Sequence, residues 1–193
     1  MAKLSAISIL LIFFTISSTS LISSCYAQEK QLVIEEKTAP KLGKPIQTHL
    51  RFYLNENFTG PDPTTVKIAE AASINASTTL FSQTYTFDNV LTLDPDTPTD
   101  VIGRAQGFYS FSAKETLAVT ILTTMIFDDK RFNGSSLIVS GRIDITAPER
   151  EIPVIGGSGV FRYATGYCKL VPYYINQKTF DNIILYNVYV THY

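Results

Sequence analysis

The sequence predicts an all-β protein, a single domain built as an eight-stranded antiparallel β-barrel. Apolar and polar residues alternate with a period of two over most of the chain, and turn-forming segments separate the alternating runs. No stretch shows the capped, 3.6-residue apolar period of an amphipathic helix. About eight strands in one domain must protect their sheet edges, and closure into a barrel does so. A β-sandwich of similar strand number is the alternative.

The first expected strand shows the alternation most clearly. Leu50, Phe52 and Leu54 share one face and are separated by Arg51 and Tyr53. Later in the chain, the Asn-Gly pair at 133–134 is the strongest hairpin signal, and the glycine-rich run 156–159 is interpreted as a hairpin connection. The expected strands are residues 46–54, 66–70, 81–88, 101–112, 116–127, 136–145, 160–174 and 182–193.

The N-terminus has the pattern of a secretory signal peptide. Lys3 precedes an apolar run from Leu4 to Phe14, and small residues lead to an expected cleavage after Ala27. The apolar run is shorter than the roughly 20 residues that a membrane-spanning helix needs. We therefore expect residues 1–27 to be a signal peptide, 28–45 a flexible charged arm, and 46–193 the barrel domain of a secreted protein without a membrane anchor.

Composition and motifs exclude several classes of function. One of the 16 Lys and Arg residues belongs to the expected signal peptide, and the rest are fewer than the 17 Asp and Glu residues. The mature chain therefore has no excess positive charge with which to bind nucleic acid. Cys168 is then the remaining cysteine, expected as a small buried hydrophobic residue. The chain has no Cys-x-x-Cys or His-x-His motif, and we expect no metal. It also has no Gly-x-Ser-x-Gly elbow for a nucleophile.

Three Asn-x-Ser/Thr sequons agree with export. They begin at Asn57, Asn75 and Asn133. Such sequons accept a glycan on the surface of a protein in the secretory pathway. We therefore expect a glycoprotein.

The expected strand 101–109 is the first candidate ligand site. Its odd positions hold Gly103, Ala105 and Gly107 and end at Tyr109. If this face points into the barrel, its small residues could leave space beside the phenol. A bulge or a close approach of the neighbouring strand explains the glycines equally well.

Glu56 is the second candidate. It continues the apolar face of Leu50, Phe52 and Leu54 by parity. A carboxyl group at the end of an inward face is costly unless it is paired or wet, which makes Glu56 a candidate site residue. The alternative is that the strand ends at Leu54 and Glu56 enters solvent.

Several segments together resemble the dirigent proteins of land plants. They are FYLNENFTGPDPT (52–64), VIGRAQGFY (101–109), FNGSSL (132–137), REIPVIGGSGVFRYATGY (150–167) and YNVYVTHY (186–193), and they span the expected domain. The resemblance implies an eight-stranded antiparallel barrel that forms a homo-oligomer, a trimer or a dimer, in the apoplast or cell wall.

The resemblance also implies a function without a cofactor. A separate oxidase, a laccase or a peroxidase, makes phenoxy radicals from monolignols such as coniferyl alcohol. The barrel binds and orients these phenols so that coupling is stereoselective, as in lignan and other phenylpropanoid biosynthesis. A difference of about 1.4 kcal/mol between two docked faces gives a tenfold product ratio. The expected role is auxiliary rather than that of an oxidising enzyme. The alternatives are a dehydratase-like ring closure through a quinone methide and a non-catalytic scaffold for wall or lignin.

The resemblance implies roles for two more residues. Tyr109 and Arg150 stand where characterised members have a pocket phenol and a guanidinium, which implies substrate binding. Glu56 joins them as a substrate-binding and candidate catalytic residue. Arg104 is also in a shared motif, but its parity is opposite to that of Tyr109, so a structural or interface role is expected.

This chain departs from lignan-forming members at two places. They have His-Asp where this chain has Asn55-Glu56, and an Asp where it has Ile143. Asp144 is adjacent, but a one-residue offset in a strand points a side chain to the other face. One pocket acid is therefore longer here, and the second is expected to be missing.

Overall fold

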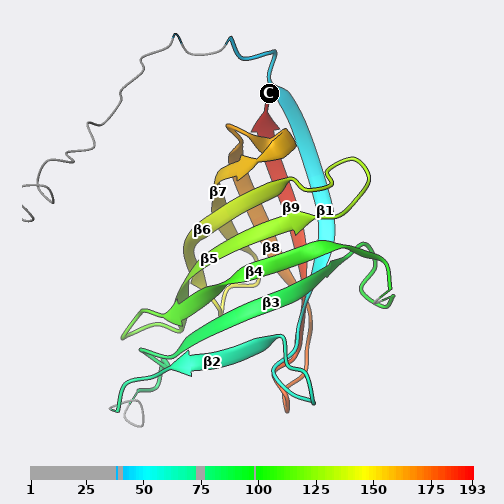
Figure 1. The fold of residues 1–193 in the computed structure, drawn as a ribbon. Coiled ribbons are helices and arrows are strands. Elements are labelled where there is room, and N and C mark those ends of the chain that lie inside the picture. Colours follow the sequence, from blue (N-terminus) through cyan, green and yellow to red (C-terminus); the bar gives the residue numbers. More distant parts are fainter. Residues whose placement is uncertain (1–37, 39–40, 73–76, 98) are drawn as a thin grey trace, which may run out of the picture. The chain divides into compact units, whose positions relative to one another are not determined.

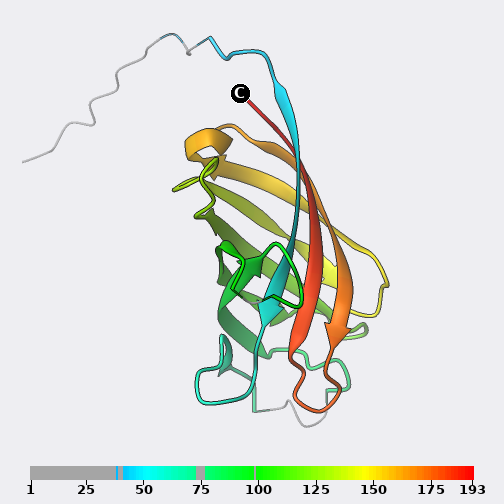
Figure 2. The same cartoon turned by 90° about the vertical axis from the view of Figure 1, so that its right-hand side faces the viewer.

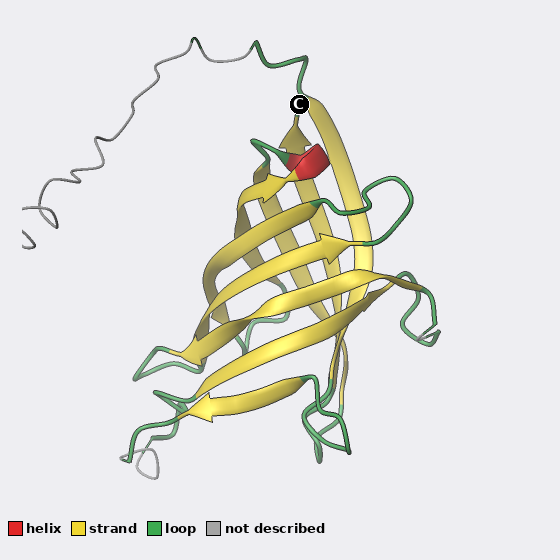
Figure 3. Ribbon diagram, viewed as in Figure 1, coloured by secondary structure: helices red, strands yellow, loops and turns green. Residues whose placement is uncertain are grey.

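The computed structural model describes residues 38, 41–72, 77–97 and 99–193. The predicted signal peptide lies outside these residues, as does most of the predicted arm. In the described part, nine strands and one short 3-10 helix follow one another (Figures 1 and 3). They are β1 (Ile46–Glu56), β2 (Thr65–Ala69), β3 (Thr84–Thr92), β4 (Val101–Phe111), β5 (Ala118–Phe127), β6 (Ser136–Asp144), β7 (Arg150–Ser158), η2 (Gly159–Phe161), β8 (Thr165–Ile175) and β9 (Asn182–His192).

Eight of these strands form a closed antiparallel barrel, as predicted. The strand order is β1-β9-β8-β7-β6-β5-β4-β3, and β1 returns to pair with β3 through Tyr53, Leu54 and Asn55. β1 pairs with β9 along its whole length, and Figure 2 shows β1, β9 and β8 side by side. β2 pairs with the first half of β3 and lies outside the closed ring (Figure 1).

The strand predicted at 66–70 exists as β2, although it lies outside the closed ring. The prediction misses β7, because the run 156–159 was interpreted as a hairpin connection. The predicted hairpin connection at 156–159 is wrong for its first three residues, which end β7; the turn begins at Gly159, whose φ is +62°. β8 therefore begins at Thr165 instead of residue 160.

Two other predicted boundaries also shift. The strand predicted at 81–88 occupies Thr84–Thr92, because residues 77–83 form turns in which Leu80 and Ser82 have positive φ. β1 extends beyond Leu54 to Glu56, so the alternative in which Glu56 leaves the strand is wrong.

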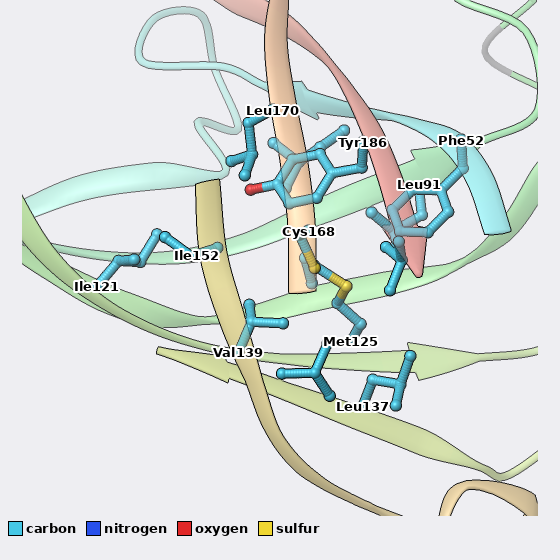
Figure 4. Packing of buried hydrophobic residues seen from close by; sticks show 14 of the residues in the cluster. Phe52, Leu91, Ile121, Met125, Leu137, Val139, Ile152, Cys168, Leu170 and Tyr186 are labelled. Carbon is cyan, nitrogen blue, oxygen red and sulfur yellow. The ribbon is translucent and has the colours of Figure 1, made fainter. Parts of the chain in front are cut away.

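A cluster of buried side chains fills one part of the barrel interior (Figure 4). Phe52 stacks on Tyr186 with ring centroids 5.7 Å apart, and Phe127 packs against Phe161 at 5.7 Å. Such aromatic pairs stabilise a core beyond the area that they bury. Cys168 lies in this cluster, as predicted, and burial raises the pKa of its thiol to about 12. At neutral pH this thiol is therefore protonated and unreactive.

Among the described residues, no helix has both the length and the apolar character to span a membrane.

Candidate functional site

The barrel contains a cavity of about 470 Å³ at the end where β1 finishes. This volume is in the range of sites that hold one drug-sized molecule. Its rim includes Leu80 and Phe180, which are exposed, so the cavity opens at this end. The three candidate residues Glu56, Tyr109 and Arg150 all line it.

Glu56 is a buried acid at the end of β1. Thr65 Oγ1 donates a hydrogen bond to its Oε1 at 3.0 Å, and Asn182 Nδ2 donates one to its Oε2 at 2.9 Å. Burial raises the pKa of the carboxyl from 4.5 to about 7, and these bonds, with the nearby Tyr109 hydroxyl, limit the rise. Near neutral pH the protonated and ionised forms of Glu56 are both populated, so it can give or accept a proton.

Tyr109 places a phenol beside this acid. It comes from β4, and its ring stacks on that of Tyr85 with centroids 5.2 Å apart. Burial, and then the charge of Glu56, raise the pKa of the Tyr109 hydroxyl above its ordinary value of 10. Tyr109 is therefore a neutral hydrogen-bond donor at physiological pH.

Arg150 lies at the start of β7 and is half-buried. Its Nε donates to the carbonyl of Ala147 at 3.2 Å, and one terminal nitrogen donates to the carbonyl of Ile145. Burial lowers the pKa of the guanidinium, but an arginine stays charged in a protein. The two carbonyls fix the group, which presents a cation to the cavity.

The sequence did not reveal four other polar residues of the site. Asn182 and Thr65 bind Glu56, while Asn89 and Tyr186 line the cavity. Tyr186 shares its parity with Val188 in the motif YNVYVTHY, which could have identified it as an inward residue. No comparable signal exists for Thr65, because it reaches Glu56 only after β2 folds against β3.

The small-residue face of β4 points inward, but it does not create the cavity. A Cβ atom on Gly107 would lie 2.0 Å from the carbonyl oxygen of Leu122 and 3.0 Å from the ring of Phe87. A Cβ on Gly103 would lie 2.0 Å from the carbonyl oxygen of Ile126. Of the two alternatives for these glycines, close approach of the neighbouring strand is therefore correct. The cavity begins at Tyr109, beyond the glycines.

The position at which lignan-forming proteins have a second acid points into the cavity, as predicted. Ile143 is buried and lines the cavity, whereas Asp144 binds the hydroxyl of Thr146. Arg104 pairs with Asp88 at 2.6 Å, with both side chains partly exposed. This pair fits the structural role expected for Arg104.

Two of the three sequons can be located. Asn57 and Asn133 are exposed, whereas Asn75 lies outside the described residues. Glycosylation stays a prediction at all three. Within the described ranges, no group of three His, Cys, Asp or Glu side chains is arranged to hold a metal ion.

The fold and the site define a class: an antiparallel barrel that encloses an aromatic-lined cavity with an acid, a phenol and a guanidinium on its wall. A sequence model described as "Dirigent-like protein" matches residues 47–191. The chain belongs to the dirigent protein family.

Individual relatives cover most of the chain. Dirigent protein 11 of Arabidopsis thaliana is 38% identical over 158 residues, which are 81% of each chain. Pterocarpan synthase 1 of Glycyrrhiza echinata is 35% identical over 147 residues, covering 76% of this chain and 78% of that protein. The solved structure of the pterocarpan synthase dirigent protein GePTS1 matches with a TM-score of 0.74 at 33% identity, covering 82% of this chain and 89% of that one.

Proposed function

We propose that this protein binds a phenolic compound in the barrel cavity and closes a ring on it with loss of water. The observation that carries the proposal is Glu56, a buried carboxyl on the cavity wall whose pKa of about 7 suits proton transfer at neutral pH. Similarity to proteins named pterocarpan synthase supports a ring closure. This reverses the preference that the sequence alone suggested, because the longer acid at position 56 reaches the cavity.

The substrate class is a phenol with one hydroxyl on the carbon attached to its ring and a second hydroxyl elsewhere. Protonated Glu56 donates its proton to the first hydroxyl, the C–O bond breaks, and water leaves. The phenolic oxygen, which is ortho or para to that carbon, loses its proton to water, which gives a quinone methide. The second hydroxyl then attacks the methide carbon, its proton returns to Glu56, and the phenolic oxygen regains a proton from water. One molecule of water is lost overall.

The other wall residues support these steps. The Arg150 guanidinium stabilises the phenolate oxygen as its charge develops. The Tyr109 hydroxyl stabilises Glu56 in its ionised form. The stacked rings of Tyr85 and Tyr109 hold the planar substrate, so that one face of the methide is attacked.

A second candidate function is the orientation of phenoxy radicals for stereoselective coupling, with a separate laccase or peroxidase as the source of the radicals. The aromatic wall of Tyr85, Tyr109 and Phe111 favours it, because planar radicals pack well on such rings. Both proposals place the protein outside the cell as a homo-oligomer, in line with the dirigent family.

Two product analyses separate these functions. In the first, a racemic phenol that carries both hydroxyls is incubated with the protein, and the ring-closed product is separated on a chiral column. We expect faster closure and an excess of one enantiomer, while closure at the uncatalysed rate would overturn the first proposal. In the second, coniferyl alcohol is oxidised by a one-electron oxidant with and without the protein. Racemic dimers at every protein concentration would exclude guided coupling of that alcohol.

A further inference from the structure

Asn89 is a buried polar residue on the cavity wall that the proposed steps do not use. It lies on β3, between the inward residues Phe87 and Leu91, and its exposed fraction is 1%. Its Oδ1 accepts a hydrogen bond from Thr64 Oγ1 at 2.6 Å and lies 3.2 Å from Thr65 Oγ1, whose single hydrogen is shared with the shorter bond to Glu56. Within the described part of the chain, its Nδ2 donates no hydrogen bond. An amide nitrogen on a cavity wall that makes no hydrogen bond within the protein is suited to a ligand.

The threonines determine which end of the amide faces them. Thr64 Oγ1 accepts a hydrogen bond from the backbone N–H of Asn57 at 3.1 Å, so its own hydrogen is available for donation. The 2.6 Å contact between Thr64 and Asn89 is short, as O–H···O bonds are. The end of the amide that faces Thr64 is therefore the carbonyl oxygen. The nitrogen is the other end of the planar amide, so it is not the atom that contacts the threonines.

One hydroxyl links Asn89 to the acid. Thr65 Oγ1 lies 3.0 Å from Glu56 Oε1 and 3.2 Å from Asn89 Oδ1, and all three residues are buried. Asn89 and Glu56 therefore belong to one hydrogen-bonded group on the cavity wall. Arg150 lies on β7, which is separated from β3 by three strands in the sheet order, so it is suited to a different oxygen of the same ligand.

We propose that Asn89 is a specificity-determining residue, whose amide nitrogen donates a hydrogen bond to a neutral oxygen of the ligand. The oxygen belongs to a hydroxyl, an ether or a carbonyl group, because the charged phenolate oxygen is bound by the Arg150 guanidinium. This inference rests on the proposed function and identifies a second polar group by which the site recognises its substrate.

Two ligand pairs that differ in one oxygen test the inference by calorimetric titration of the full chain. The phenolic pair is coniferyl alcohol and isoeugenol, which lacks the terminal hydroxyl. The non-phenolic pair is cyclohexanone and methylenecyclohexane, in which a methylene replaces the oxygen. The variants are Asn89→Leu and Asn89→Asp, and Gln106→Leu is the control on the outer face of β4. Asn89→Asp keeps an oxygen acceptor for the threonines and removes the amide nitrogen.

We expect the wild type to bind the oxygen-bearing member of each pair about fivefold more tightly, the size of one neutral hydrogen bond. Both Asn89 variants should lose this preference and Gln106→Leu should keep it. If Asn89→Leu does not fold, the ligand preference of Asn89→Asp alone tests the role of Asn89. The role of Asn89 would be overturned if the wild type showed no preference for the oxygen-bearing ligands, or if the Asn89 variants showed the same preference as the wild type. Either result would leave the binding of phenols unaffected. If no phenol binds but the cyclohexanone preference depends on Asn89, the site stands and the proposed phenolic function falls.

Discussion

The Glu56 carboxyl and the Asn182 amide meet at 2.9 Å across the junction between the first and the last strand of the barrel. The two residues are register partners in the β1–β9 ladder, although 126 positions separate them in the chain. Barrel closure therefore brings the acid and its partner together. The pKa of Glu56 depends on the complete fold and not on a local motif.

Replacement of Glu56 by Gln should abolish proton transfer and leave the cavity shape almost unchanged. We expect the rate of ring closure to fall by about 100-fold or more, the usual contribution of a general acid or base. Steady-state rates with a phenolic substrate measure the effect. Glu151→Gln, on the exposed outer face of β7, is the matched control and should retain the full rate. Equal rates for Glu56→Gln and the control would exclude Glu56 as the proton carrier.

The stability of the fold should depend on pH through Glu56. Burial raises the pKa of this carboxyl from 4.5 to about 7, so the folded protein binds the proton more tightly than the unfolded chain. The resulting stabilisation is fully present below pH 4.5 and is lost as the pH rises to about 7. At about 1.4 kcal/mol per pH unit, the loss is on the order of 3 kcal/mol.

Urea unfolding at pH 4.5 and pH 8 measures this effect when wild type and Glu56→Gln are compared. Other carboxyls, such as Asp144 and Asp181, titrate in both proteins and cancel in the difference. The stability of the wild type relative to the variant should fall between the two pH values. A difference that does not change with pH would contradict the raised pKa.

Asp181 should hold in place the part of the cavity wall that belongs to the loop between β1 and β2. Its carboxylate accepts hydrogen bonds from the backbone N–H of Phe58 at 2.7 Å and from the Thr59 hydroxyl at 3.2 Å. Phe58 lines the cavity and packs edge-on against Tyr85. Asp181→Ala removes both bonds, so we expect KM to rise about fivefold, as for the loss of a hydrogen bond.

The isosteric Asp181→Asn variant separates the charge of Asp181 from its shape. The negative charge of Asp181 contributes to the raised pKa of Glu56. The pH–rate profile of Asp181→Asn should therefore shift to lower pH, with KM nearly unchanged. Identical pH profiles for wild type and Asp181→Asn would show that the charge has no effect on Glu56.

Ile143→Asp would restore the second acid of lignan-forming relatives. Ile143 is buried on the cavity wall, so the new carboxyl should destabilise the fold by about 2 to 4 kcal/mol. When it is ionised, its charge raises the pKa of Glu56 further, and the pH–rate profile should move to higher pH. Ile143→Asn is the uncharged control. The same profile for both variants would mean that position 143 has no electrostatic contact with Glu56.

Strand parity in the sequence predicted the inward direction of Glu56 and Tyr109, because a half-buried strand alternates strictly. Parity also predicted correctly that Ile143 points into the barrel and that the neighbouring Asp144 does not. Local patterns failed at β7, where Pro153 and two glycines lie inside a strand that its neighbours stabilise.

The hydrogen bonds around Glu56 could not be predicted from the sequence for another reason. Asn89 and Thr65 become neighbours through the packing of β2 on β3, and the cavity volume depends on how the rings of Phe87 and Phe111 pack. Both features are properties of tertiary structure. The resemblance implied a pocket position for Arg150, and the structure places it on the cavity wall.

The titration of the Glu56 carboxyl tests the central claim most directly. Carbon-13 NMR of protein labelled at the glutamate carboxyl carbons follows each acid from pH 3 to pH 9, and the resonance absent from Glu56→Gln belongs to Glu56. We predict that this resonance titrates with a pKa of about 7. A midpoint near the ordinary value of 4.5 would contradict a cavity acid that exchanges protons at neutral pH.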